Sequence, residues 1–253
     1  RVGRRQTDFA LRCLTPEWLA RRLSPGDLTR SGMWRKPELE KAEKLNLIRE
    51  TGVIAIMRAQ SSDQLVAAAQ AILEGGVRVI EVTMTTPGAL AVIDQAGRHF
   101  GDDVLFGVGS VLDAETARTA ILAGAGFVVA PTLKLETIAL CRRYGIPVVP
   151  GCATPTEALT AWEAGADMVK LFPASFVGPA LVKAWLAPLP QLEIVPVGGV
   201  DLDTAAPFIR AGSAALGVGN SLINQKLLDT GDMAELTRRA RAFIEQVNLG
   251  RAG

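Results

Sequence analysis

The sequence predicts an α/β fold, a (β/α)8 TIM barrel that follows an N-terminal extension. From residue 45 onward, eight short apolar segments alternate with amphipathic segments, which is the pattern of parallel βα units. Roughly 210 residues for eight such units is the size of a closed barrel. A glycine also recurs where a predicted helix gives way to a strand, at Gly75, Gly124, Gly165 and Gly212.

Each recurring glycine is expected to end its helix in the left-handed conformation, which needs no Cβ atom, and to precede a buried strand. Four more strands are predicted from the apolar runs at 52–57, 104–108, 146–150 and 192–197. Amphipathic helices are predicted at 63–73, 113–122 and 156–162. An open doubly wound sheet is the alternative, but Gly107-Val108-Gly109 lacks the third glycine of a dinucleotide-binding turn.

Composition excludes several classes of protein. At 253 residues and 49% hydrophobic, the chain is long enough to bury one large core. Its longest apolar runs are strand-sized, below the roughly 18 to 20 residues needed to cross a bilayer, so no membrane insertion is expected. The net charge of +1 offers no basic field for nucleic acid. With one histidine in the chain, His99 in a predicted helix end, a histidine-built metal site or triad is disfavoured.

Polar residues lie at the predicted strand ends that converge on one mouth of a barrel. The most informative is Lys170, which interrupts an apolar run at 167–173, because a buried ammonium costs free energy unless it is paired, neutralised or used. The alternative is a lysine whose head reaches water or pairs with a carboxylate. The other candidates at strand ends are Arg58, Glu81, Thr83, Ser110, Pro131, Thr132 and Thr154.

The last two predicted strands end in glycine-rich turns. These turns are Gly198-Gly199-Val200 and Gly217-Val218-Gly219, the second followed by Asn220 and Ser221. In barrels, the turns after the seventh and eighth strands aim backbone N–H groups and a helix N-terminus at a phosphate. Either glycine sequence alone is equally compatible with a tight turn that binds no ligand. Together they predict a phosphate site formed by Gly198, Gly199, Gly219, Asn220 and Ser221.

Five motifs occur in an order and spacing that match a known family. They are Val79-Ile80-Glu81-Val82-Thr83, Gly107-Val108-Gly109-Ser110-Val111, Gly151-Cys152-Ala153-Thr154-Pro155-Thr156-Glu157, Lys170-Leu171-Phe172-Pro173-Ala174 and Pro196-Val197-Gly198-Gly199-Val200. From residue 45 to 247 the chain resembles the class I aldolases that cleave 2-keto-3-deoxy-6-phosphogluconate and its galactonate epimer. The resemblance implies that Lys170 forms a Schiff base, that Glu81 is the general acid/base and that Phe172 lines the pyruvate pocket. It also implies a homotrimer and no metal or organic cofactor.

Two positions depart from the family pattern. Many members have an arginine two residues after the threonine of the second strand, where this chain has Thr85. Arg58 is therefore the candidate for holding the substrate carboxylate, as in the family's other branch. The serine that commonly binds phosphate after the eighth strand is replaced by Asn220, with Ser221 next to it.

The residue types themselves favour the same chemistry. Burial lowers the pKa of a lysine, so a neutral Lys170 amine can attack the ketone of a 2-keto acid. Glu81 can remove the C4 hydroxyl proton, and Arg58 can pair with the C1 carboxylate. The hydroxyls of Thr83, Ser110 and Thr154 can orient the substrate or a relay water. Alternatively, Glu81 only neutralises Lys170 and Arg58 is a salt-bridge residue of the rim, while Pro131 only ends a strand.

The predicted domains are a basic extension, 1–44, and the barrel, 45–253. Residues 1–37 contain nine basic and three acidic residues, and a helix is predicted to start at Thr15-Pro16. This arm is interpreted as a transit-peptide remnant, a segment that docks on the trimer or another protein, or a linker junction. The three cysteines, Cys13, Cys141 and Cys152, suit a reducing compartment, so a cytoplasmic location is expected, or an organellar one if the arm is targeting.

Three functions stay open at this point. The first is cleavage of the six-carbon phosphorylated keto acid. The second is pyruvate aldolase or decarboxylase activity on unphosphorylated keto acids such as 4-hydroxy-2-oxoglutarate or oxaloacetate. The third is a non-catalytic assembly scaffold, for which the basic arm is the single hint. A sugar-phosphate epimerase is disfavoured because its paired acids or histidines are absent at the predicted strand ends.

Overall fold

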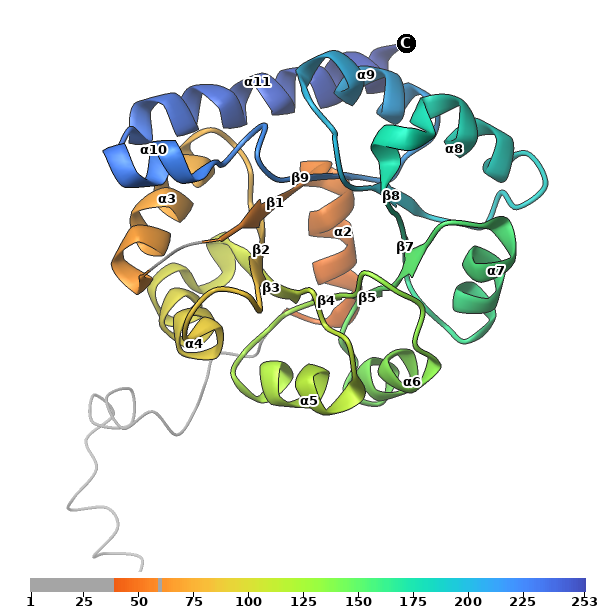
Figure 1. The fold of residues 1–253 in the computed structure, drawn as a ribbon, viewed down its shortest axis with the longest axis horizontal. Coiled ribbons are helices and arrows are strands. Elements are labelled where there is room, and N and C mark those ends of the chain that lie inside the picture. The colour runs from red at the N-terminus through yellow and green to blue at the C-terminus, as the bar shows by residue number, and fades with distance from the viewer. Residues whose placement is uncertain (1–38, 59–60) are drawn as a thin grey trace, which may run out of the picture. The chain divides into compact units, whose positions relative to one another are not determined.

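The computed structural model describes residues 39–58 and 61–253 (Figure 1). Residues 1–38 of the predicted extension, including the helix predicted to start at Thr15, lie outside the described residues. The first described helix is α2 (Lys41–Thr51), and it crosses the predicted domain boundary at residue 44. Leu39–Gly253 forms one unit by its internal contacts.

The paired strands of the described chain run parallel and form two sheets. They are β1 (Val53–Met57), β2 (Val79–Thr83), β3 (Leu105–Gly109), β4 (Val128–Val129), β5 (Val148–Val149), β6 (Gly151–Cys152), β7 (Val169–Leu171), β8 (Ile194–Pro196) and β9 (Leu216–Val218). The larger sheet has the order β5-β4-β3-β2-β1-β9, and the smaller one has the order β6-β7-β8. The predicted parallel α/β architecture is confirmed.

Pro150, the last residue of the strand predicted at 146–150, separates β5 from a further short strand, β6, that was not predicted. A proline has no N–H group to donate to a sheet ladder, but its carbonyl still accepts from the Lys170 N–H at 2.8 Å. The two sheets also approach each other between β8 and β9, where Val197 and Gly217 form an isolated parallel bridge. The strands surround a central region, and most helices lie outside them (Figure 1).

Helices follow most of the strands, as the predicted βα repeat requires. They are α3 (Ser62–Glu74), α4 (Ala89–Phe100), α5 (Ala114–Leu122), α6 (Leu135–Arg143), α7 (Pro155–Glu163), α8 (Gly178–Leu186), α9 (Leu202–Arg210), α10 (Gln225–Thr230) and α11 (Met233–Ala252), with short 3-10 turns η1 (Gly101–Asp103) and η2 (Ala174–Phe176). Helices α3, α5 and α7 confirm the three predicted amphipathic segments. All three are capped at their N-termini by side chains of polar residues, Ser61 on α3, Asp113 on α5 and Thr154 on α7.

The recurring glycines behave as predicted in three of four repeats. Gly124, Gly165 and Gly212 have φ angles of +100°, +90° and +104°. In the first repeat the prediction is wrong by one residue, because Gly75 is right-handed and Gly76 has the positive φ of +96°. Gly75 is required for another reason, since a Cβ atom there would overlap the Cβ of Ala240 on α11. The close approach of α3 and α11 therefore leaves room only for glycine at position 75.

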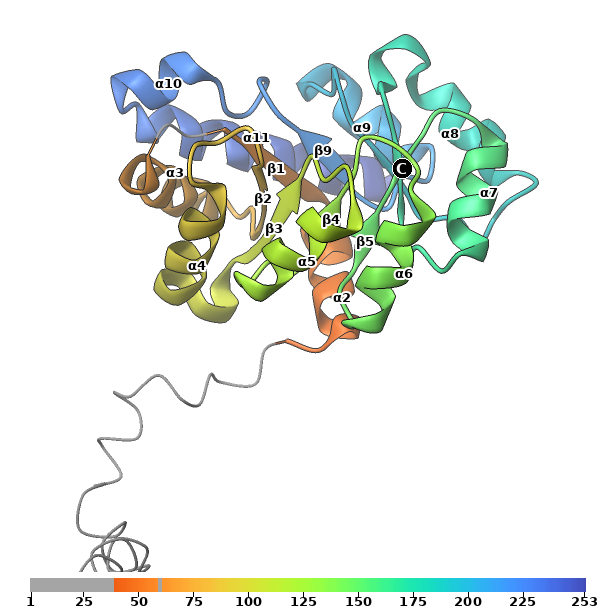
Figure 2. The same cartoon turned by 60° about the horizontal axis from the view of Figure 1, so that its bottom comes forward.

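Helix α2 lies at the end of the strands where they begin (Figure 2). Its buried Leu47 and Ile48 belong to an inner apolar cluster with side chains of the strands, Ile54, Val79, Leu105, Phe127, Val129, Val149, Met168, Val195, Val197 and Ala215. A second, larger cluster fills the layer between the strands and the outer helices. Arg49 also pairs with Glu193 through two hydrogen bonds of 2.8 Å. Helix α2 thus covers one end of the strands and leaves the C-terminal ends for other uses.

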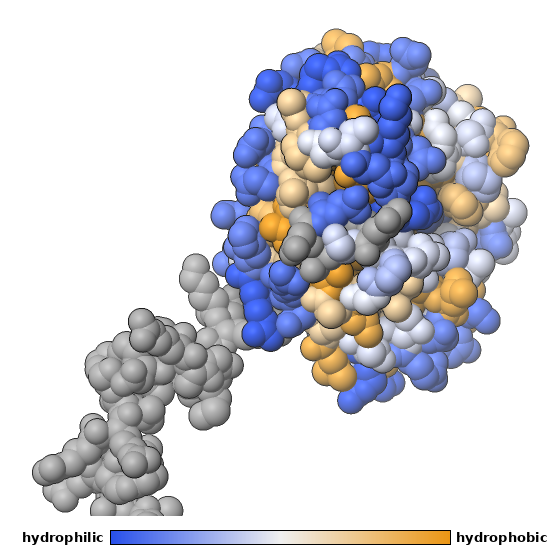
Figure 3. Space-filling model, turned by 60° about the vertical axis from the view of Figure 1, so that its left-hand side comes forward, coloured by the Kyte–Doolittle hydropathy of each residue, from blue (hydrophilic) through white to orange (hydrophobic). Residues whose placement is uncertain are grey.

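No helix within residues 39–58 and 61–253 is both long and apolar enough to cross a bilayer. The face that carries α3, α4 and α10 is mostly hydrophilic, with apolar side chains scattered over it (Figure 3).

Candidate active site

Lys170 and Glu81 are the buried charged side chains at the C-terminal halves of the strands. Lys170 is the middle residue of β7 and is 4% exposed, and Glu81 is the middle residue of β2 and is 2% exposed. In the sheets, Glu81 is in register with Ile56 of β1 and Gly107 of β3, and Lys170 is in register with Gly151 and Val195. Both ionisable side chains are therefore buried within their strands, and their predicted catalytic roles stay predictions.

The surroundings of Lys170 favour its neutral form. Burial lowers the pKa of its ammonium, the negative charge of Glu81 raises it and the positive charge of Arg58 lowers it. The Nζ atom lies 4.8 Å from the centre of the Phe172 ring. Among the described residues, Lys170 has no carboxylate within the 4.0 Å of an ion pair. Hence the alternative of a lysine neutralised by a direct buried ion pair with Glu81 does not fit the geometry.

Glu81 is placed to hold a proton. Burial raises the pKa of its carboxyl group, while the charges of Lys170 and Arg58 act in the opposite direction. The carboxylate lies next to the Cα of Gly109 on β3, in the space where a Cβ atom would overlap its Oε1. Lys170, Glu81 and Arg58 thus form one electrostatically coupled group, in which the two buried members have opposite pKa shifts.

Arg58 and Ser110 follow strands β1 and β3 directly, and both are exposed. Exposure leaves their polar groups available to a ligand, as predicted for substrate contacts. Thr83 is 3% exposed and belongs to a cluster of hydroxyl groups. Its Oγ1 lies 2.9 Å from that of Thr85 and 3.4 Å from that of Thr86. The threonine that replaces the family's arginine is therefore hydrogen-bonded to another predicted site residue.

Thr154 is the N-cap residue of α7, a role that the sequence analysis did not predict. Its hydroxyl accepts from the Glu157 N–H at 3.2 Å and donates to Glu157 Oε2 at 2.9 Å, so it forms the capping box of α7. The motif Thr-Pro-Thr-Glu at 154–157 carries the signal for this box in the sequence. Its predicted contact with substrate stays a prediction, because the donor of the hydroxyl is already used by the cap.

Two candidates for pocket walls lie beside glycines. The Pro131 carbonyl lies where a Cβ atom of Gly151 would be, so β4 and β6 approach closely at the strand ends. Phe172 is 39% exposed, and a Cβ atom at Gly198 would lie 3.2 Å from its ring. The ring of Phe172 thus extends from Lys170 to the first of the two predicted phosphate turns.

The two glycine turns present unpaired N–H groups. The Gly198 carbonyl accepts from the Ser175 N–H at 2.9 Å, on the β7 side of β8. In a trans peptide the N–H points away from the carbonyl, so the Gly199 N–H points toward the β9 side. The Gly219 carbonyl accepts from Leu222 and Ile223 at 2.9 and 2.8 Å, so the Asn220 N–H points out of its turn. Neither N–H has a protein partner within the described chain.

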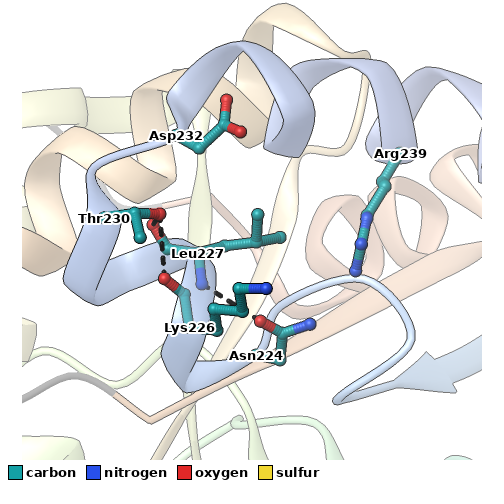
Figure 4. Close-up of a pocket in the computed structure, with 6 residues that line it drawn as sticks. All are labelled: Asn224, Lys226, Leu227, Thr230, Asp232 and Arg239. Carbon is teal, nitrogen blue, oxygen red and sulfur yellow. Dashed lines mark hydrogen bonds between the residues drawn. The ribbon is translucent and has the colours of Figure 1, made fainter.

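A polar hollow of about 510 Å³ lies between α10 and α11 (Figure 4). It is lined by Asn224, Lys226, Leu227, Thr230, Asp232 and Arg239. Arg239 Nη1 donates to the Ser221 carbonyl at 3.4 Å, which links α11 to the loop after β9. The sequence gives no local signal for this contact, because 18 residues separate its partners. In the described part of the chain, no three His, Cys, Asp or Glu side chains are grouped to hold a metal ion.

Comparison with known proteins places this site in a family. A family model described as KDPG and KHG aldolase matches residues 45–239. The chain belongs to the KDPG and KHG aldolase family. Among its relatives in this aldolase family is the 2-dehydro-3-deoxy-6-phosphogalactonate aldolase of Escherichia coli (strain K12), which is 36% identical over 195 residues, 76% of this chain and 93% of the relative.

Other members of the aldolase family cover most of the chain as well. The 2-dehydro-3-deoxy-phosphogluconate aldolase of Treponema pallidum (strain Nichols) is 33% identical over 208 residues, 82% of this chain and 97% of the relative. A solved structure described as native KDPGal aligns with a TM-score of 0.75 and 33% identity, and the alignment covers 79% of this chain and 96% of the other. The family expected from the five motifs is confirmed.

Proposed function

We propose that this chain is a class I aldolase, a carbon–carbon lyase that reversibly cleaves 2-keto-3-deoxy-6-phosphogluconate or its galactonate epimer to pyruvate and glyceraldehyde 3-phosphate. The observation that carries the proposal is the buried Lys170 amine, whose pKa is lowered by burial, beside a buried Glu81 whose pKa is raised. The names of the relatives support the choice of substrates.

In the proposed reaction, the neutral Lys170 amine adds to the C2 ketone, and uptake of one proton with loss of water gives a protonated imine. The same proton is released when the imine is hydrolysed at the end of the cycle. The ionised Glu81 carboxylate takes the proton of the C4 hydroxyl. The C3–C4 electron pair moves toward the imine, which becomes a neutral enamine, and the aldehyde leaves. Glu81 then returns its proton to C3 of the enamine, and water hydrolyses the resulting imine to pyruvate and the free Lys170 amine. No metal or organic cofactor is needed to balance these steps.

Substrate contacts are proposed for the other strand-end residues. The exposed Arg58 guanidinium would pair with the C1 carboxylate, since its charge already acts on both Lys170 and Glu81. Thr83, Ser110 and Thr154 would orient hydroxyl groups or a water molecule, although Thr154 would first have to release its cap contact. Pro131 and Phe172 would form the walls of the pyruvate pocket.

Phosphate binding is proposed for Gly198, Gly199, Gly219, Asn220 and Ser221. The N–H groups of Gly199 and Asn220 support it, because each points out of its own turn without a protein partner in the described chain. Because the turns follow the adjacent strands β8 and β9, a phosphate between them would receive donors from both sides. Binding there would favour 6-phosphorylated substrates over unphosphorylated keto acids.

The full fold is proposed to be a closed (β/α)8 barrel, residues 45–253. The bond from the Asp167 N–H to the Val148 carbonyl on β5 and the bridge between Val197 and Gly217 support closure, because they connect the two sheets near β5 and between β8 and β9. Of the predicted extension, 1–44, residues 39–44 belong to the unit Leu39–Gly253. The arm for docking or targeting is therefore proposed for residues 1–38 alone.

A homotrimer is the proposed assembly. Large apolar side chains that remain exposed on the described chain support subunit contacts, and the most exposed of them is Phe176, at 85%, just after the strand of Lys170. A solved structure that aligns with 33% identity and a TM-score of 0.74 is described as a cube-shaped protein cage designed by fusing symmetric oligomeric domains, which also supports an oligomer. A cytoplasmic location is proposed because Cys141 and Cys152 are free, buried thiols, which suits a reducing compartment.

Borohydride trapping tests the function directly. Incubation with pyruvate and borohydride should add one reduced pyruvyl group to the peptide that contains Lys170, and Lys170→Arg should abolish the label. Labelling at Lys134 or Lys183 would reassign the nucleophile. A chain that takes up no pyruvate at all would instead be an aldolase-like scaffold.

A further inference from the structure

We propose that Arg239 is a positioning residue for the loop after β9, and that it acts by fixing the backbone of this loop and not by attracting phosphate with its charge. The proposal rests on the function proposed above, because it concerns the preference for a phosphorylated substrate. Arg239 would not touch the substrate. It would hold the carbonyl of Ser221 so that the donors of the turn stay in place.

The guanidinium of Arg239 connects two elements. It projects from α11 toward the segment that precedes α10 (Figure 4). Its Nε donates to Glu235 Oε1 at 2.8 Å, and its Nη1 donates to the Ser221 carbonyl at 3.4 Å. A guanidinium can do both at once because its five N–H donors lie in one rigid plane. Glu235 thereby fixes the orientation of the group that contacts the loop.

The loop after β9 has few other restraints. Its own turn is closed by the two bonds to the Gly219 carbonyl, and the buried Leu222 and Ile223 anchor the chain that follows. Further along, Asn224 caps α10 by accepting from the Leu227 N–H. Within residues 39–58 and 61–253, Arg239 supplies the side-chain hydrogen bond that reaches the Ser221 carbonyl from outside the turn. Its removal would therefore loosen the backbone between Gly219 and Leu222.

The charge of Arg239 is largely compensated. Glu235 is bound by both Arg238 and Arg239, and these contacts lower the pKa of its carboxyl group to about 2, so it stays ionised at neutral pH. The anionic Asp232 and the cationic Lys226 line the same hollow as Arg239. Of these five groups, three are cationic and two are anionic, so one net positive charge remains behind the loop. Backbone placement is therefore the larger effect that Arg239 can have.

The test compares Arg239→Gln, Arg239→Lys and the parent with the phosphorylated keto-deoxy acid and with its unphosphorylated analogue. Loss of a positioning hydrogen bond should raise KM for the phosphorylated substrate about two- to tenfold, with kcat within about twofold. The unphosphorylated substrate should be unaffected. Lysine keeps the charge but not the planar fork of donors, so Arg239→Lys should raise KM for the phosphorylated substrate as much as Arg239→Gln does. Full rescue by lysine would overturn the proposal in favour of simple charge attraction.

Arg238→Gln is the matched control. Arg238 lies next to Arg239, binds the same Glu235 through contacts of 2.6 and 2.7 Å, and is 66% exposed on its side chain. In the described chain its hydrogen bonds and ion pair go to Glu235 and none reaches the loop, so its loss should leave KM unchanged. An equal rise in KM for both variants would contradict a specific role of Arg239.

Two further measurements separate the possible failures. Inhibition by inorganic phosphate should weaken in Arg239→Gln by the same factor as KM rises, which reports on the loop without turnover. Pyruvate trapping should be unchanged in every variant, since Lys170 is untouched. If the parent itself fails to trap pyruvate, the proposed function is at fault. If the parent traps pyruvate but phosphate inhibition is equal in parent and Arg239→Gln, the role of Arg239 is refuted.

Discussion

The Glu81 carboxylate occupies the space that a Cβ atom of Gly109 would fill. The two residues lie on the adjacent strands β2 and β3, where Glu81 pairs in register with Gly107 and Thr83 pairs with Gly109. Gly109 has no positive φ angle, so the backbone conformation does not demand glycine there. Glycine is required at this position because the Glu81 carboxylate needs the space. The second glycine of this strand, Gly107, makes the same kind of room for the Phe127 ring.

Gly109→Ala should therefore impair catalysis without abolishing imine formation. The added methyl group would displace the Glu81 carboxylate, and a small misplacement of a catalytic group can cost up to about 10²-fold in rate. We expect kcat to fall at least about tenfold, while borohydride trapping of pyruvate at Lys170 survives. Steady-state kinetics and mass spectrometry of the trapped protein measure the two effects separately.

Gly97→Ala is the control for this change. Gly97 lies within α4 and is exposed, and a Cβ atom there would meet nothing within 4 Å. The same substitution should leave kcat unaltered and raise the free energy of unfolding by about 0.5–1 kcal/mol, because alanine loses less backbone entropy in a helix. A similar loss of activity in both variants would show that the clash with Glu81 is not the cause.

The pH dependence of Glu81→Gln gives a second prediction. In the parent, the negative Glu81 raises the pKa of Lys170, in opposition to burial. The uncharged glutamine removes that effect, so the pKa of Lys170 should fall further and the rise of imine trapping with pH should move to lower pH. At the same time kcat should fall by about 10²-fold or more, because the proton shuttle is lost.

The two readouts of Glu81→Gln decide between its roles. A shifted trapping profile with normal turnover would reduce Glu81 to an electrostatic neighbour of Lys170. Arg58→Gln should move the trapping profile in the opposite direction, to higher pH, because the positive charge of Arg58 lowers the pKa of Lys170. A shift of the same sign in both variants would contradict the coupling of the three groups.

Local sequence patterns predict the strand ends well and the contacts across the fold poorly. Glu81 and Lys170 could be placed because a charged residue in a short apolar run must lie on a buried strand. The capping box of Thr154 has a local signal too, the glutamate three residues later. The need for glycine at position 75 has no local signal, since it comes from the Cβ of Ala240 on α11, far along the chain. Pairs such as Arg239 and Ser221 depend on how α11 packs, and no spacing encodes that.

Helix α2 gives a third prediction, on stability. Ile48 is fully buried in the inner cluster, where it contacts side chains of several strands. Ile48→Ala should lower the free energy of unfolding by about 2–5 kcal/mol, the usual cost of a buried isoleucine truncation. Leu249→Ala on α11 is the comparison, because Leu249 is 55% exposed and its loss should cost about 0.5 kcal/mol or less. Equal costs in urea unfolding would mean that α2 is not part of the core.

The last prediction concerns the side chain at the phosphate turn. If the N–H groups of Gly199 and Asn220 are the main donors, phosphate binding should depend little on the side chain of Asn220, which is exposed. A neutral side-chain hydrogen bond contributes about 0.5–1.5 kcal/mol net. Asn220→Ala should therefore raise KM for the phosphorylated keto-deoxy acid roughly two- to tenfold and change kcat little.

The parent must first prefer the phosphorylated substrate over its unphosphorylated analogue in kcat/KM. If it shows no such preference, the two glycine turns are only tight turns, and the chain would be a pyruvate aldolase for shorter or unphosphorylated keto acids. If the preference exists but Asn220→Ala abolishes it, the amide side chain and not the backbone is the main phosphate ligand. A loss of two- to tenfold, with most of the preference retained, is the result that backbone donors from both turns require.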